Sequence, residues 1–171
     1  MARTDISDCL IHFTSGATHG DAFRTLQKIV AESCLYGSSR MIRGGYSCVC
    51  FSEAPLESLE SGLMHPRYYS RYSPFGIMVE KRWLFLKGGR PVIYQPESEY
   101  EQLPETHRWR HVRYDLEVDP PIDFTWEREW RIQTDALYFD NTVASIVVYD
   151  KVWAEKLIEE HEWEQESQVE Q

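Results

Sequence analysis

The stretch Trp126-Glu127-Arg128-Glu129-Trp130-Arg131, followed by Ile132 and Gln133, decides the fold that we expect for this chain. Its aromatic residues predict a strand over residues 126–133. Because side chains alternate along a strand, Glu127, Glu129 and Arg131 are expected to share one face. The opposite face would carry Trp126, Arg128, Trp130 and Ile132. Two carboxylates on one face repel each other, so the pattern indicates either a cationic or hydroxyl-rich ligand or a solvated face neutralised by Arg131 and nearby basic residues.

Further strands and helices are predicted outward from this segment. The other expected strands cover residues 9–14, 46–51, 75–79, 91–94 and 144–149. One expected helix covers residues 21–33 with Asp21 as N-cap, and another begins at Ser52 with Pro55 in its first turn. Two more helices are expected over residues 81–86 and 152–163, and residues 96–107 form a helix or an excursion. Strands and helices follow no steady β-α-β alternation, which favours the α+β class.

Length and composition predict one domain. The chain has 171 residues, so we assign residues 1–163 to a single domain and residues 164–171 to an acidic tail that is expected to fray. No apolar run approaches the roughly 18 residues of a membrane span. The first residues lack the pattern of a signal peptide, so the expected location is cytoplasmic, with no membrane partner.

The net charge of −10 excludes non-specific coating of nucleic acid, which depends on basic side chains. The charge is uneven, however: residues 65–113 hold nine Lys or Arg and five Glu, a local balance of +4. This segment either binds a nucleic-acid acceptor, through stacking on its tyrosines and contacts of its arginines with phosphates, or packs as an amphipathic segment over the core. The residues that would make such a face are Arg67, Tyr68, Tyr69, Arg71 and Tyr72.

Several common chemistries find no support in the sequence. There is no G-x-G-x-x-G, P-loop, H-E-x-x-H or G-x-S-x-G pattern, which argues against Rossmann dehydrogenases, NTPases, zincins and α/β-hydrolases. The four cysteines, Cys9, Cys34, Cys48 and Cys50, are too few for a disulfide framework and lack a second pair at zinc-finger spacing. We therefore expect buried free thiols and no metal.

Two further groups of residues are candidates for a binding site. His12 and Thr14 share one face of the first expected strand, and an imidazole with a hydroxyl suits recognition of a ribose or an amide. A core-edge histidine bonded to the backbone explains His12 equally well. Ser52 stands at the end of the second strand, where capping a helix is a sufficient explanation.

The order of these pieces resembles that of small bacterial ADP-ribosyltransferase-like proteins of phage defence. The quoted pieces are His12-Phe13-Thr14, Leu26-x-x-Ile29, Cys50-Phe51-Ser52-Glu53, Phe75-Gly76-Ile77-x-x-x-Lys81, Pro91-Val92-Ile93-Tyr94 and Trp126 to Arg131. The sequence is most similar to AbiGi-type abortive-infection proteins and more distantly to DarT toxins. The resemblance covers roughly residues 9–150.

This resemblance implies a split mixed sheet of the ADP-ribosyltransferase type, with flanking helices and with NAD bound in its cleft as substrate. It implies that His12 contacts the NAD ribose beside Thr14, that Ser52 lies near the nicotinamide side, and that Glu129 or Glu127 is catalytic. Arg43 or Arg131 would then neutralise the pyrophosphate or hold the acids in place.

Three functions follow as hypotheses. The first is an NAD-dependent ADP-ribosyltransferase, or an NAD glycohydrolase, that acts in phage defence or a toxin–antitoxin pair. The second is an inactive module of the same fold that binds a partner protein, such as an antitoxin, or a nucleotide. The third is a nucleic-acid-modifying enzyme that uses the basic 65–113 segment.

Overall fold

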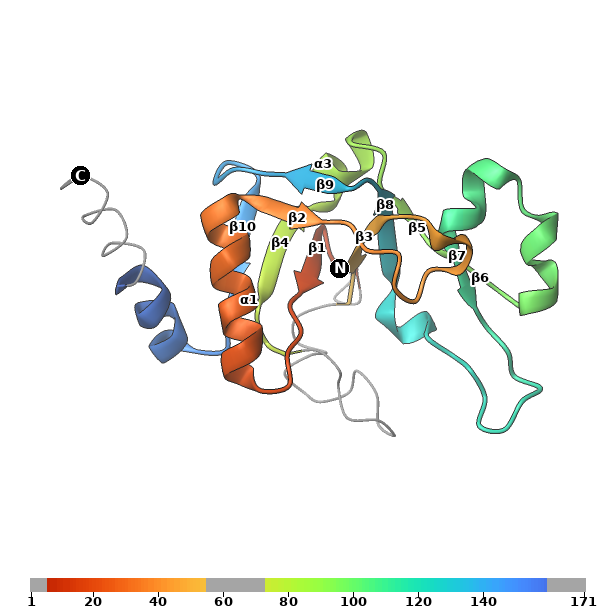
Figure 1. Cartoon of the computed structure of the whole chain (residues 1–171), viewed down its shortest axis with the longest axis horizontal. Coiled ribbons are helices and arrows are strands. Elements are labelled where there is room, and N and C mark those ends of the chain that lie inside the picture. Colours follow the sequence, from red (N-terminus) through yellow and green to blue (C-terminus); the bar gives the residue numbers. More distant parts are fainter. Residues whose placement is uncertain (1–5, 55–72, 160–171) are drawn as a thin grey trace.

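An antiparallel sheet of six strands forms the centre of the computed structural model, which describes residues 6–54 and 73–159 (Figure 1). The strands lie in the order β10-β4-β1-β3-β8-β5, and each neighbouring pair is antiparallel. Their bounds are β1 Cys9–Phe13, β3 Cys48–Ser52, β4 Gly76–Glu80, β5 Arg90–Pro91, β8 Glu129–Gln133 and β10 Ala144–Val147. The α+β class is confirmed, but the expectation that this sheet is mixed is wrong. Parallel neighbours need a crossover connection, and the chain that leaves β1 through a helix enters a separate strand pair instead.

Two short strand pairs flank the main sheet. The strand β2 (Cys34–Tyr36) pairs antiparallel with β9 (Ala136–Tyr138), and β6 (Ile93–Gln95) pairs parallel with β7 (His111–Arg113). The second pair stands at the far end of the molecule from the C-terminal helical segment, residues 151–159 (Figure 1). The sequence does not predict β2, β7 and β9, because strands of three residues are too short to display a period.

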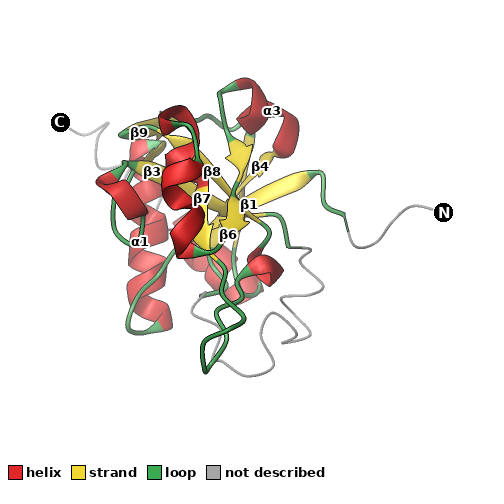
Figure 2. Ribbon diagram, turned by 90° about the vertical axis from the view of Figure 1, so that its right-hand side faces the viewer, coloured by secondary structure: helices red, strands yellow, loops and turns green. Residues whose placement is uncertain are grey.

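The helix α1 (His19–Glu32) packs against the main sheet and buries Ala22, Phe23 and Leu26. It begins two residues before the expected start. Thr18, and not Asp21, is the N-cap: the Thr18 hydroxyl accepts from the Asp21 N–H, and the Asp21 carboxylate accepts from the Thr18 N–H. This reciprocal capping box satisfies two backbone donors that would otherwise lack partners. Figure 2 shows α1 along one side of the strands.

The register of the sheet assigns each side chain to one of its two faces. Residues directly opposite each other in an antiparallel pair project from the same face. Ile11 is opposite Ser52, and Ser52 is opposite Glu129, so all three share a face. We call it the cavity face. The other face, which we call the core face, carries Leu10, Val49, Phe51, Ile77, Val79, Trp130 and Ile132, all buried in the main hydrophobic core.

The strand that contains Glu129 is shorter than expected. Residues Thr125–Glu127 form a 3-10 turn, η4, and Arg128 adopts a left-handed conformation with φ 45° before β8 starts at Glu129. The expectation of one strand over 126–133 is therefore wrong for its first three residues. Glu129 and Arg131 do share a face, as predicted, whereas strand alternation does not govern Glu127.

The chain between α3 (Lys81–Leu86) and β7 also differs from expectation. The predicted strand 91–94 is divided into β5 and β6, and Val92 between them donates its N–H to the Glu129 carbonyl at 3.0 Å. The helix or excursion expected over residues 96–107 consists of two 3-10 helices, η2 (Glu97–Gln102) and η3 (Glu105–Arg110), the second of which extends beyond it. Ser52 is the last residue of β3, and Glu53 and Ala54 are not helical; the remainder of the helix expected from Ser52, and the arginine–tyrosine cluster at 67–72, lie outside the described residues. Within the described part of the chain, no helix is long and apolar enough to cross a membrane.

Candidate functional site

A buried ion pair stands at the centre of the cavity face. Arg131 donates from Nε to Glu129 Oε1 at 2.7 Å and from Nη2 to Oε2 at 3.2 Å, so the guanidinium holds both carboxylate oxygens. The side chains are 6% and 12% exposed. Burial alone lowers the pKa of Arg131, but the charge and hydrogen bonds of Glu129 outweigh it and the pKa is raised. Arg131 is therefore a cation at neutral pH.

The remaining donors of Arg131 connect the sheet to its flanking segment. Its Nη1 donates to the carbonyl oxygens of Trp109 and His111, both at 3.0 Å. The Glu129 N–H donates to the Tyr94 hydroxyl at 3.1 Å, and burial is the main reason that the pKa of Tyr94 is raised to about 12. Glu129 is thus held in place by Arg131 at its carboxylate and by Tyr94 at its backbone.

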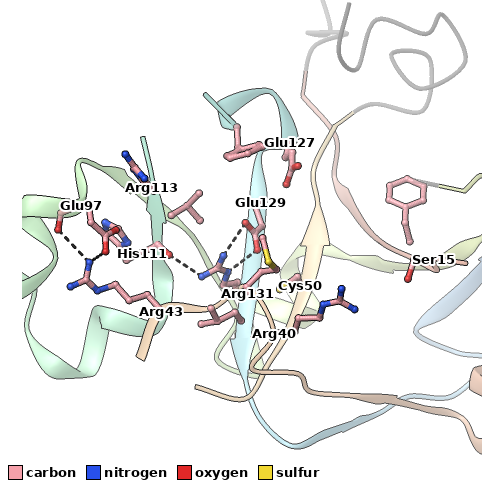
Figure 3. Close-up of a pocket in the computed structure, with 15 residues that line it drawn as sticks. Ser15, Arg40, Arg43, Cys50, Glu97, His111, Arg113, Glu127, Glu129 and Arg131 are labelled. Carbon is pink, nitrogen blue, oxygen red and sulfur yellow. Dashed lines mark hydrogen bonds and ion pairs between the residues drawn. The ribbon is translucent and has the colours of Figure 1, made fainter. Parts of the chain in front are cut away.

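These two side chains form part of the wall of an open cavity of about 560 Å³ (Figure 3). Its charged lining residues are Arg40, Arg43, Glu97, Arg113, Glu127, Glu129 and Arg131, and its apolar lining residues are Phe13, Met41, Ile42, Val112 and Phe124. A cavity of this size, with apolar walls and a few convergent polar groups, has the usual character of a small-molecule site. The arginines make it suited to a ligand that carries negative charge.

Glu127 reaches the cavity without belonging to the strand. The Ser52 hydroxyl donates to the Glu127 carbonyl at 2.7 Å, which fixes the η4 turn against the end of β3. The carboxylate of Glu127 then lies above Glu129 in the view of Figure 3. Ser52 itself is 4% exposed and its hydroxyl also accepts from the Ala54 N–H. The hydroxyl of Ser52 therefore positions the turn that bears Glu127, and it is not part of the cavity lining.

Arg43 lies in the opposite wall. It belongs to the 3-10 turn η1 (Arg43–Gly45), where Gly44 has φ +83°, a conformation that favours glycine. A Cβ on Gly44 would lie 2.6 Å from the Tyr100 hydroxyl, so the turn approaches Tyr100 closely. The Arg43 guanidinium lies 3.9 Å from the centroid of the Tyr100 ring and pairs with Glu97.

His12 and Thr14 lie on the other side of the sheet. Both follow the alternation of Leu10 on β1, so they project from the core face, opposite to Glu129. The His12 ring is 2.8 Å from the Cys50 carbonyl through Nδ1 and packs edge-on against Phe51. The Thr14 hydroxyl, 2% exposed, donates to the Ala22 carbonyl at 2.9 Å. The structure thus brings Glu127, Glu129, Arg131 and Arg43 together at one cavity and leaves His12, Thr14 and Ser52 outside its lining.

The cysteines are all free, and Cys34 and Cys48 are buried. Burial is the main cause that raises the pKa of the Cys48 thiol to about 11. Burial and then the Glu129 carboxylate raise the pKa of Cys50 still further. Both thiols are protonated at neutral pH, so neither is an activated nucleophile. No group of three metal-ligating side chains is found in residues 6–54 and 73–159.

The described part of the basic segment is largely engaged in internal contacts. Arg90 donates to the carbonyls of Phe85 and Gly89, and Arg110 donates to the Pro91 carbonyl. Arg108 pairs with Glu101 at 2.9 Å. These arginines stabilise the fold around the cavity, and the hypothesis of a nucleic-acid face now concerns Arg67, Tyr68, Tyr69, Arg71 and Tyr72, which lie outside the described residues.

Several residues of the cavity are not predicted from the sequence. Arg40 and Met41 lie in the loop before η1, and His111 and Arg113 belong to β7. The described residues offer no ion-pair partner to the Arg40 side chain. The sequence carries no local pattern for these residues, because a strand of three residues and an irregular loop leave no periodic signal.

Comparison with models of protein families, with curated proteins and with solved structures finds no match to this chain. The class is therefore defined by the structure: a mixed α+β domain with a six-stranded antiparallel sheet and few helices. Its candidate site is the cavity that contains Glu127, Glu129 and Arg131.

Proposed function

We propose that the cavity binds NAD as a substrate and that the protein is an ADP-ribosyltransferase-type enzyme, which transfers ADP-ribose to a macromolecular acceptor or to water. The observation that carries the proposal is the meeting of two carboxylates, Glu127 and Glu129, with the buried Arg131 at an open cavity. The order of sequence pieces over residues 9–150, which resembles that of ADP-ribosyltransferase-like defence proteins, supports the same activity.

The reaction needs a fixed negative charge beside the sugar. When the bond between the nicotinamide nitrogen and C1′ of the ribose breaks, nicotinamide leaves with the bonding electrons and positive charge develops on the sugar. Glu129 accepts a hydrogen bond from the ribose 2′-hydroxyl and stabilises that charge. Its two oxygens are held by Arg131, but a carboxylate has about four acceptor positions, so both remain able to accept from a ligand. A carboxylate positioned in advance contributes several kcal/mol, of the order of 3, to such a step.

Glu127 has a different task in this proposal. It takes the proton from the acceptor, which is a hydroxyl, an amine or a water molecule, as the acceptor attacks C1′. Arg40, Arg43 and Arg113 line the same cavity and carry the positive charge that a pyrophosphate requires. A role in phage defence or in a toxin–antitoxin pair belongs to the proposal through the resemblance.

The test is the release of nicotinamide from labelled NAD. We expect release by the wild type, a loss of about 100-fold or more in Glu129→Gln, and a smaller loss in Glu127→Gln. Glu32→Gln, on the exposed end of α1, is the matched control and should equal the wild type. Absence of nicotinamide release together with absence of NAD binding in calorimetry would refute the proposal. Growth arrest on expression, relieved by Glu129→Gln, would test the biological role.

A second candidate, a module that binds a nucleotide or a partner protein without catalysis, rests on a specific observation. His12 projects from the core face, away from Glu129, and the Glu129 charge is already compensated by Arg131. Binding of NAD or ADP-ribose with no release of nicotinamide and no labelled acceptor would favour this candidate over the enzyme.

A further inference from the structure

His111 is a buried histidine in the wall of the cavity, and its Nε2 atom has no hydrogen-bond partner among the residues that the structure describes. The residue opens β7 and is 3% exposed. A buried polar atom left without a partner costs free energy, so nearly all such atoms in native proteins are satisfied. Nε2 is therefore an exception in the unliganded protein, and it occurs at a residue that lines the candidate site.

The other contacts of the ring decide whether Nε2 donates or accepts. Burial lowers the pKa of His111, and the nearby charges of Arg43 and Arg131 act in the same direction, so the ring is neutral at pH 7. Backbone groups at Pro96 and Gln95 act in the opposite direction and raise the pKa, as a carbonyl oxygen does when it faces a ring N–H. Proline has no N–H, so the group at Pro96 is a carbonyl. Because Nε2 is the atom without a partner, we assign the hydrogen to Nδ1, which leaves Nε2 with a lone pair.

The surroundings of Nε2 define the ligand group that fits it. Ile42 and Val112 line the same cavity and offer no donor from their side chains. The Tyr100 ring packs edge-on against His111 at 5.2 Å, with Arg43 on the same tyrosine. Arg43 also pairs with Glu97 and Glu101, whose side chains are 49% and 68% exposed, so these ion pairs hold Arg43 only weakly.

We propose that Nε2 of His111 accepts a hydrogen bond from an N–H or O–H group of the ligand and thereby sets the specificity of the cavity. This inference rests on the proposed nucleotide site and extends it. A nucleotide offers two donors of this chemistry, the exocyclic amino group of adenine and a ribose hydroxyl. His111 is then a specificity-determining residue, whereas Glu129 and Glu127 act on the sugar and its acceptor.

The experiment measures the affinity of four probes by calorimetry: AMP, purine riboside 5′-monophosphate, 2′-deoxy-AMP and 3′-deoxy-AMP. We expect the wild type to bind AMP about tenfold tighter than the one analogue that lacks the donor recognised by His111. His111→Leu should bind AMP and that analogue equally. His111→Gln should retain part of the preference, because its amide oxygen accepts. His107→Leu changes an exposed histidine outside the cavity lining and should behave as the wild type.

The outcomes separate the inference from the proposed enzyme. If purine riboside 5′-monophosphate binds more weakly than AMP, the donor is the amino group. If one of the deoxynucleotides binds more weakly, the donor is the hydroxyl that it lacks. Equal binding of all four probes by the wild type, binding of none, or an unchanged preference in His111→Leu overturns the inference. If circular dichroism shows that His111→Leu does not fold, His111→Met takes its place, and an unchanged preference in that variant overturns the inference in the same way. Nicotinamide release is assayed separately. If the probes bind with the expected selectivity but no nicotinamide is released, only the proposed enzymatic activity is wrong. If His111→Leu turns over NAD with the wild-type KM, only the inference about His111 is wrong.

Discussion

Removal of Arg131 should destabilise the protein more than any exposed charge substitution. Arg131→Met leaves the Glu129 carboxylate, 12% exposed, without its cation, and it leaves the carbonyls of Trp109 and His111 without this donor. Breaking a buried pair by removing one partner costs about 3–5 kcal/mol. The expected loss in the free energy of unfolding is therefore about 4 kcal/mol, a large part of the stability of an ordinary domain.

Urea unfolding, followed by tryptophan fluorescence and circular dichroism, measures this loss. Glu129→Leu alone should also destabilise, because it leaves the buried guanidinium with carbonyl partners only. The double variant Arg131→Met/Glu129→Leu should be more stable than the sum of the single losses predicts, by at least about 1 kcal/mol, since no buried charge remains unpaired. Lys28→Met, which breaks the exposed pair with Glu32, is the control and should cost less than about 0.5 kcal/mol. A cost below about 1 kcal/mol for Arg131→Met, or additive losses in the double variant, would refute the reasoning.

Three further predictions concern other parts of the molecule. Burial lowers the pKa of His12 and of His111 below the ordinary value of 6.5, so below that pH the unfolded chain binds more protons than the folded protein. The free energy of unfolding should therefore be highest above pH 6.5 and should fall as the pH drops toward the pKa values of the folded state, by up to about 1.4 kcal/mol per pH unit for each histidine. Urea titrations between about pH 7.5 and pH 5 check this. A flat profile over that range would contradict it. Thr14→Val removes the hydroxyl that donates to the Ala22 carbonyl and should lower the free energy of unfolding by about 1–2 kcal/mol. Nucleotide affinity should stay unchanged, because Thr14 projects from the core face. Weaker nucleotide binding in calorimetry would contradict the assigned face. Met41 has φ 64° and is 83% exposed, so Met41→Gly should raise the free energy of unfolding by about 0.5–1 kcal/mol, and a lower value in urea unfolding would be the contrary result.

The sequence predicts the local pattern of this fold better than its long-range register. Alternation correctly placed Glu129 and Arg131 on one face, because both lie inside a regular strand. It failed for Glu127, because Arg128 adopts a left-handed conformation and the strand begins after it. Glu127 still reaches the cavity, through the hydrogen bond from Ser52 to its carbonyl, and strand periodicity holds no information on such a contact.

The same limit explains the position of His12. The period of a strand correctly predicts that His12 and Thr14 share a face, but it leaves open which face. That choice depends on the pairing of Ile11 with Ser52 and of Ser52 with Glu129, which joins residues far apart in the chain. A shift of one residue in either pairing would move His12 to the cavity face.

The assignment of faces also decides where a histidine of the candidate site comes from. On β1 the residue that lines the cavity is Phe13, and the adjacent His12 is turned toward Phe51 in the core. The histidine of the cavity wall is instead His111, whose carbonyl accepts from Arg131, the guanidinium that also holds Glu129. A ligand that meets both His111 and Glu129 therefore spans two elements connected by one buried arginine. Loss of Arg131 should accordingly reduce nucleotide affinity as well as stability, even though Arg131 need not touch the nucleotide.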